Sequence, residues 1–179
     1  MAYNKRTNLH KKNLNGKKAG TRRRANSDIL EDTILISTTH LHGIIDEWHK
    51  KRESENPKHI IVWSRNMMDR YAPKSYRELS MRNAHECVLT SMMYGLICVY
   101  EMLKSEDSGV KEGLKDTLDK LYEIYTSAVK HLGHSAIGTE LGSMFNKMAL
   151  LVDVVDEFVK SNNYDLAEKE LTSFFNSLI

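Results

Sequence analysis

The stretch Cys87–Leu103, CVLTSMMYGLICVYEML, is the longest apolar run in the chain and determines the kind of fold that the sequence predicts. It is shorter than the roughly 20 residues that a helix needs to cross a bilayer, and it contains Thr90, Ser91 and Glu101. Its apolar residues cover almost every side of a helix, which is typical of a helix that is surrounded by other helices. We therefore expect this stretch to form the central helix of a bundle.

Helical periodicity continues on both sides of this stretch, in a chain with only two prolines. The four residues Ile60–Trp63 are compatible with a short strand, but apolar residues recur at helical spacing up to Tyr71, so we predict a helix there. A capping box of Ser75 and Glu78 predicts the start of the central helix, and Gly133 is a natural C-cap for a later one. The expected helices cover residues 28 to about 51, 57–71, 75–104, 110–132, 136–160 and a short C-terminal segment after 163. In the helix 110–132 the expected buried stripe is Leu114, Leu118, Leu121, Tyr122, Tyr125 and Val129. The fold class is thus all-α, a helical bundle of five to six helices preceded by a basic N-terminal arm.

The arm comprises residues 1–27 and contains nine Lys or Arg side chains and no acid. Because the whole chain has 26 basic and 24 acidic side chains, residues 28–179 carry 17 basic against 24 acidic, a formal charge of −7. The arm has too few apolar residues to form a core, so we expect it to be disordered unless bound, ahead of a single domain at 28–179. Its cations are candidate phosphate ligands: Lys5, Arg6, Lys11, Lys12, Lys17, Lys18, Arg22, Arg23 and Arg24.

The body has a charge polarity of its own. Residues 50–82 hold nine basic side chains against four acidic ones, whereas residues 101–179 hold eight against fourteen. Trp63, Tyr71 and Tyr76 are interleaved with these cations and could stack on unpaired bases, although rings at helical spacing more often form a core. The candidate nucleic-acid-binding residues of the body are Arg65, Arg70, Lys74, Arg77 and Arg82.

The sequence offers no positive sign of an enzyme or of a metal site. Asp46 and His49 have the spacing of half a di-metal centre, but no second carboxylate-x-x-His element occurs, and Cys98 stands alone. No nucleophile elbow, P-loop or dinucleotide-binding glycine motif is found. Cys87 and Cys98 are eleven residues apart on one expected helix, roughly 16 Å, too far for a disulfide. We predict a non-enzymatic protein with no catalytic residues, no metal and no cofactor.

Two functions remain open at this stage. The first is a nucleic-acid-binding structural protein of nucleoprotein or coat type, in which the arm neutralises phosphates and the body self-associates as a homo-oligomer. Only its organisation is similar to that of helical viral nucleocapsid and coat proteins, since no motif matches. The second is a small helical regulator or adaptor, whose basic arm docks on RNA or on an acidic protein partner. We expect reduced thiols, and we find neither a signal peptide nor a membrane segment in the sequence. The predicted location is therefore inside the cell, in the cytoplasm or nucleus, or within a virion.

Overall fold

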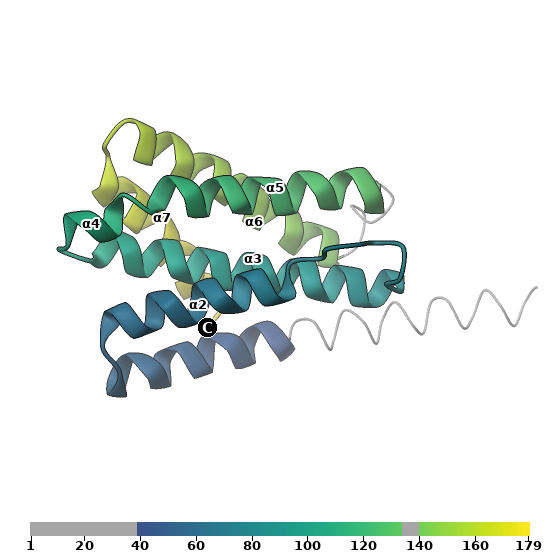
Figure 1. Cartoon of the computed structure of the whole chain (residues 1–179), viewed down its shortest axis with the longest axis horizontal. Coiled ribbons are helices and arrows are strands. Elements are labelled where there is room, and N and C mark those ends of the chain that lie inside the picture. Colours follow the sequence, from purple (N-terminus) through teal and green to yellow (C-terminus); the bar gives the residue numbers. More distant parts are fainter. Residues whose placement is uncertain (1–38, 134–139) are drawn as a thin grey trace, which may run out of the picture. The chain divides into compact units, whose positions relative to one another are not determined.

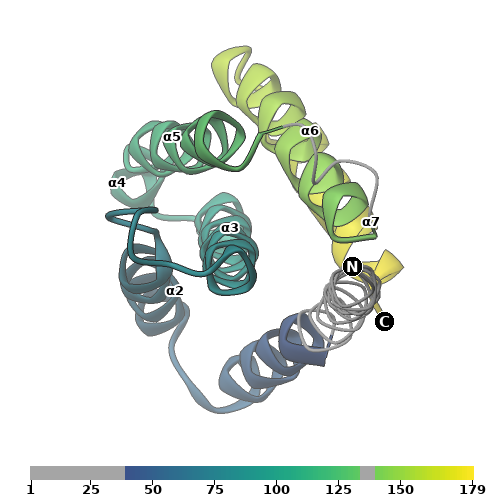
Figure 2. The ribbon, with the colours of Figure 1, turned by 90° about the vertical axis from the view of Figure 1, so that its right-hand side faces the viewer.

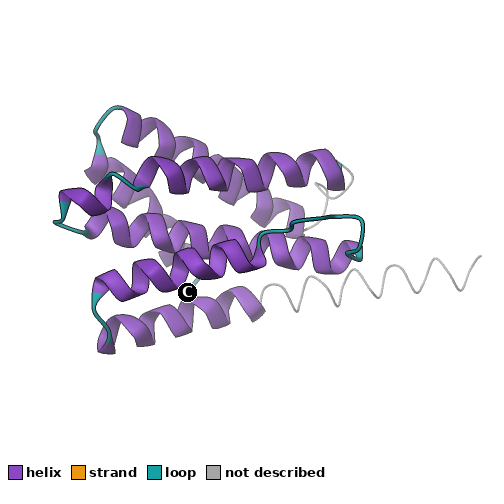
Figure 3. Ribbon diagram, viewed as in Figure 1, coloured by secondary structure: helices purple, strands orange, loops and turns teal. Residues whose placement is uncertain are grey.

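A computed structural model describes residues 39–133 and 140–179, without the side chains of residues 81, 82, 140 and 141. The chain divides into two compact units, Met1–Ile36 and Ser37–Ile179, and all the described residues belong to the second unit. Within the described part every regular element is a helix and none is a strand (Figure 3). This confirms the predicted all-α bundle, including the choice of helix over strand at Ile60–Trp63.

Six labelled helices follow a helical segment that covers residues 39–54. The labelled helices are α2 (Pro57–Tyr71), α3 (Met81–Lys104), α4 (Ser108–Lys111), α5 (Leu114–Leu132), α6 (Glu140–Lys160) and α7 (Tyr164–Ser177) (Figure 1). Pro57 is the first residue of α2, where its missing N–H costs nothing, and the Asn56 side chain caps that helix. Gly133 ends α5 at a positive φ of 68°, as expected for a glycine C-cap.

Helix α3 is the centre of the bundle. It contacts all five of the other labelled helices, which surround it in the end-on view (Figure 2). Every residue from Val88 to Leu103 is buried. By length and composition, residues 83–104 could cross a membrane, but 89% of the window lies buried inside the bundle, as in the core helix of a soluble protein. The prediction of a central helix is confirmed.

Gly95 allows the close approach of helices at this centre. A Cβ atom added there would lie 2.4 Å from Leu121 Cδ2 and 2.8 Å from Met68 Sδ. These two side chains belong to α5 and α2, so both helices meet α3 at a position where only glycine fits without a shift.

The predicted start of the central helix was wrong. Helix α3 begins at Met81 rather than near Ser75, and its N-cap is Ser80, whose hydroxyl accepts a hydrogen bond from the Asn83 N–H at 3.2 Å. The preceding residues form a connection in which the Tyr76 ring stacks on His131 of α5, with 4.6 Å between ring centroids. That contact holds the connection against α5 in a non-helical path, so the capping box is not used.

The predicted helix 110–132 is in fact two helices. The short α4 ends at Lys111, and α5 begins at Leu114 with Gly113 as its N-cap. A Cβ at Gly113 would lie 2.8 Å from Met102 Cε, so the junction packs closely on α3. The expected stripe was also too wide, because Tyr122 is 55% exposed and the buried face of α5 instead includes Thr117 and Ala128.

Candidate nucleic-acid interface

The nine cations of the N-terminal arm lie outside the described residues. The structure therefore bears on the candidate interface only through the basic segment 50–82 and the helices that pack against it. Three outcomes are possible for each of these cations: a carboxylate partner, a buried position, or an exposed position with no partner.

The first part of the segment is largely neutralised by carboxylates. Lys51 Nζ lies 3.0 Å from Glu55 Oε1, and Lys58 Nζ lies 3.1 Å from Asp107 Oδ2. Lys58 and the Gly109 N–H, which both bond to the Asp107 carboxylate, hold its pKa below the usual value. These cations serve the fold locally and have little charge left for an external anion.

Arg52 has the most deeply placed partner of the segment. Its Nε atom lies 3.1 Å from Glu101 Oε1, and only 5% of the Glu101 side chain is exposed. The indole Nε1–H of Trp48 donates to the same oxygen at 2.7 Å. The guanidinium also lies over the rings of Trp48 and Tyr100, at 5.4 and 5.7 Å from their centroids. Arg52 thus ties the helical segment 39–54 to α3.

Arg70, Lys74 and Arg77 differ from these cations. All three are exposed, and within the described part of the chain no ion pair joins any of them to a carboxylate. Arg70 lies in the last turn of α2, and the other two lie in the connection to α3. Asp69, the acid beside Arg70, is already bound by Lys120 at 3.2 Å.

These three cations lie at one end of the bundle, together with the point where the described chain begins. The His40 and Tyr71 rings are in edge contact at 6.4 Å, which brings the start of segment 39–54 beside the end of α2. The stack of Tyr76 on His131 brings the last turn of α5 to the same place, with exposed Lys130 next to it. We name Arg70, Lys74, Arg77 and Lys130 the basic end. Lys130 was missed by sequence reasoning, and its position in the last turn of a helix was the only signal.

Two predicted ligands are not part of this group. Arg65 is half-buried, and its Nη2 atom lies 3.8 Å from Met102 Sδ near the C-terminal end of α3, away from the basic end. Arg82 lies in the first turn of α3, and its side chain is outside the described residues.

The three aromatic residues that were candidates for base stacking pack within the chain. Trp63 meets Tyr94 edge to face at 5.3 Å, and Tyr71 stacks on the same ring at 6.0 Å. Tyr94 is 3% exposed, and burial, with smaller effects of Glu47 and Tyr71, raises its pKa to about 12. Burial also raises the pKa of Tyr76. These rings pack against other side chains of the protein and are therefore not free to stack on bases. Any phosphate binding by this region thus depends on its Arg and Lys side chains.

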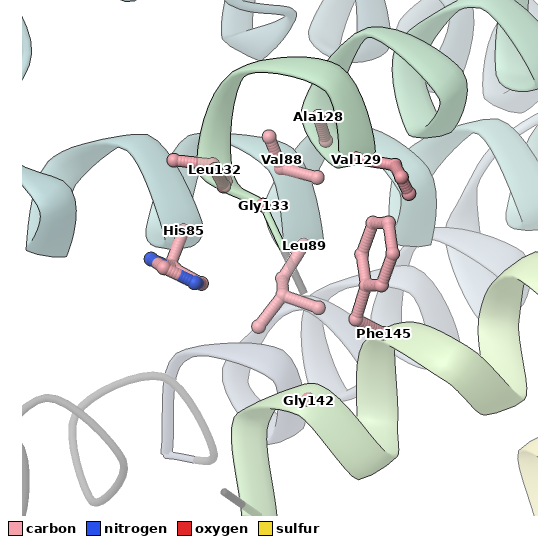
Figure 4. Close-up of a pocket in the computed structure, with 9 residues that line it drawn as sticks. All are labelled: His85, Val88, Leu89, Ala128, Val129, Leu132, Gly133, Gly142 and Phe145. Carbon is pink, nitrogen blue, oxygen red and sulfur yellow. The ribbon is translucent and has the colours of Figure 1, made fainter. Parts of the chain in front are cut away.

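An apolar pocket lies between α3, α5 and α6 near the basic end (Figure 4). Its lining residues are His85, Val88, Leu89, Ala128, Val129, Leu132, Gly133, Gly142 and Phe145. His85 is the one titratable side chain among them, whereas acid–base catalysis needs several such groups to converge.

Thiol and metal chemistry find no support in the described part of the chain. Both cysteines are free thiols, and burial raises the pKa of each, which disfavours the reactive thiolate. No three His, Cys, Asp or Glu side chains of the described residues converge as a metal site requires. The absence of enzymatic activity stays a prediction.

No protein-family model matches this chain, and neither a curated protein nor a solved structure matches it.

Proposed function

We propose that this protein is a non-enzymatic nucleic-acid-binding structural protein of the nucleoprotein or coat type. The basic arm neutralises phosphates, the basic end adds further contacts, and the helical body associates with other copies. One observation carries the proposal: nine cations without a single acid precede a domain in which three exposed cations without a carboxylate partner among the described residues, Arg70, Lys74 and Arg77, lie where the described chain begins.

The support from the basic end is a matter of charge balance. Lys51, Arg52 and Lys58 have carboxylate partners, so a phosphate of DNA or RNA would have to displace those carboxylates before it could bind. Arg70, Lys74 and Arg77 have none among the described residues and can bind phosphate at no such cost. Phosphate contacts position a protein on nucleic acid without reading its sequence, so binding is expected to show little sequence preference.

The test uses the full-length chain and a full-length variant in which all nine Lys and Arg of residues 1–27 are replaced by Gln. Binding to a fluorescent oligonucleotide is measured by anisotropy over a range of salt concentrations. If most of the nine cations neutralise phosphates, the arm contributes about −6 to −8 to the slope of log affinity against log salt in the wild type. The variant has a much flatter slope.

A matched control keeps the arm and replaces exposed lysines on α7 and α5, Lys169→Gln and Lys115→Gln, which leaves the slope almost unchanged. Equal affinities and equal slopes for the wild type and the nine-fold variant would overturn the proposal. Light scattering with and without nucleic acid tests the assembly: large regular particles support a coat-type protein, and a fixed small oligomer supports a regulator or adaptor.

A further inference from the structure

The outer face of α5 and α6 carries a group of tyrosine and acidic side chains that the proposed function does not use. Tyr125 Oη donates a hydrogen bond to Asp153 Oδ1 at 2.8 Å, joining the two helices. The Tyr122 ring meets the Tyr125 ring edge to face at 5.1 Å. The two helices lie side by side in both views of the ribbon (Figures 1 and 2).

Carboxylates outnumber cations on this face. Asp153, Asp156 and Glu157 lie within little more than one turn of α6, and Asp119 of α5 is close enough to act on Lys160. Lys160 pairs with two of these carboxylates, at 2.6 Å from Asp156 Oδ2 and 3.9 Å from Glu157 Oε1, and this single cation cannot neutralise all four acids. Burial is the main cause of the raised pKa of Tyr125, and the neighbouring carboxylates of Asp153 and Asp156 raise it further.

The same face exposes large apolar surface. Tyr122 is 55% exposed and Leu150 is 65% exposed. Leu150 precedes Asp153 by three residues and so lies on the same side of α6. We name this surface the acidic tyrosine face and define it by Asp119, Tyr122, Tyr125, Leu150, Asp153 and Asp156. Exposed apolar side chains set among acids fit a macromolecular partner that is basic and partly apolar, and do not fit a small cation.

The N-terminal arm of this chain has that composition. Its first part combines cations with the apolar side chains of Tyr3, Leu9 and Leu14, and the arm contains no acid that the face would repel. Lys and Arg also bind well over tyrosine rings. The occupant is therefore expected to be an extended basic segment, whose cations meet the carboxylates while its apolar residues cover Tyr122 and Leu150.

We infer that the acidic tyrosine face docks the basic arm of a second copy of this chain. This inference rests on the self-association in the proposed function and gives it a specific contact. In the absence of nucleic acid, the arms bind the acidic faces of neighbouring copies, and a nucleic acid competes for the same cations. The contact is electrostatic and exposed, so it weakens as salt rises.

The test uses a fluorescein-labelled synthetic peptide with the sequence of residues 2–24. It is titrated onto the full-length chain whose nine arm cations are replaced by Gln, so that the protein's own arm does not compete. At low ionic strength the peptide binds saturably. The double variant Asp119→Asn and Asp153→Asn, made in that background, weakens binding about fivefold, since it removes two exposed carboxylates that no lysine or arginine of the described residues already binds in an ion pair.

Matched controls locate the effect. The double variant Asp165→Asn and Glu170→Gln removes the same charge from exposed positions on α7 and leaves peptide affinity almost unchanged. Tyr122→Ala removes an exposed ring, keeps the net charge and weakens binding as well. Circular dichroism and urea unfolding check that each variant is folded.

Three results would overturn the inference: no binding of the peptide, equal binding to the Asp119/Asp153 and the Asp165/Glu170 double variants, or a wild-type chain that stays monomeric at all concentrations without nucleic acid. Sedimentation of the wild type is expected to show salt-sensitive self-association, which Asp119→Asn and Asp153→Asn, made in the chain with its wild-type arm, should abolish. Failure of the proposed function is a separate result, because it concerns oligonucleotide binding by the arm and leaves the peptide titration unaffected.

Discussion

The two parts of the basic segment 50–82 have the same sign of charge but different uses. Up to Lys58, most of the cations bind carboxylates: Lys51 binds Glu55, Arg52 binds buried Glu101, and Lys58 binds Asp107. From Arg70 to Arg77, the cations are exposed and have no carboxylate partner among the described residues.

This difference shows that a local charge count does not measure the charge that can bind a ligand. A cation that already has a partner contributes to the fold, and its neutralisation should be seen mainly in stability. An unpaired cation of the basic end contributes little to the fold, and its neutralisation should be seen mainly in the salt dependence of binding.

The largest expected effect on stability follows removal of the buried carboxylate of the paired region. Glu101→Ala leaves the Trp48 N–H and the Arg52 guanidinium without their shared acceptor. We expect a loss of about 3 kcal/mol in the free energy of unfolding, the lower part of the range for broken buried pairs, because Arg52 keeps contact with water. Urea denaturation followed by circular dichroism measures it.

Glu101→Gln is the matched control for that variant. The amide oxygen can still accept from the Trp48 N–H, so the cost falls to about 1 kcal/mol. In both variants, oligonucleotide affinity under conditions where the protein is folded should equal that of the wild type. A loss of affinity without a loss of stability would show that the paired region also binds nucleic acid.

A smaller effect tests whether the aromatic residues of the segment belong to the core. The pKa of Tyr94 is raised to about 12, so its neutral form stabilises the folded state below pH 10, and this contribution is lost as pH rises toward 12. A spectroscopic titration of tyrosinate should show a late-ionising class that loses one residue in Tyr94→Phe. Identical late classes in the two proteins would mean that Tyr94, and with it the rings of Trp63 and Tyr71, is open to solvent.

The smallest effect concerns the ion pair of Lys58 with Asp107. Since the pKa of Asp107 lies below its usual value of 3.8, its carboxylate stabilises the fold above that pH, and the contribution is lost as pH falls through the lowered pKa. NMR titration of the Asp107 carboxyl should give a midpoint below 3.8 that rises in Lys58→Gln. An unchanged midpoint would show that Lys58 does not lower the pKa of Asp107, and so that the two side chains do not form this ion pair.

The sequence predicted the fold class and the role of α3 because an apolar run on every side of a helix has only one stable place in a bundle. It misplaced the start of α3 because two serines can cap a helix there, and the choice depends on the distant contact of Tyr76 with His131. It also did not predict the break at Gly113, since that break depends on close packing against Met102.

The candidate site could be predicted only as a region. The basic segment 50–82 could be recognised from its residue types alone. Which of its cations are paired could not, because the ion pairs to Glu101 and Asp107 join positions far apart in sequence that no local pattern predicts. Lys130 joins the basic end for the same reason, through the packing of α5 on the connection between α2 and α3.

The most direct test compares two triple variants of the full-length chain with equal loss of charge. The first neutralises the unpaired cations, Arg70→Gln, Lys74→Gln and Arg77→Gln. The second neutralises paired ones, Lys51→Gln, Lys58→Gln and Lys120→Gln. The slope of log oligonucleotide affinity against log salt should become shallower by about 2 to 3 in the first variant, and change little in the second. Equal changes in the two variants would contradict the account.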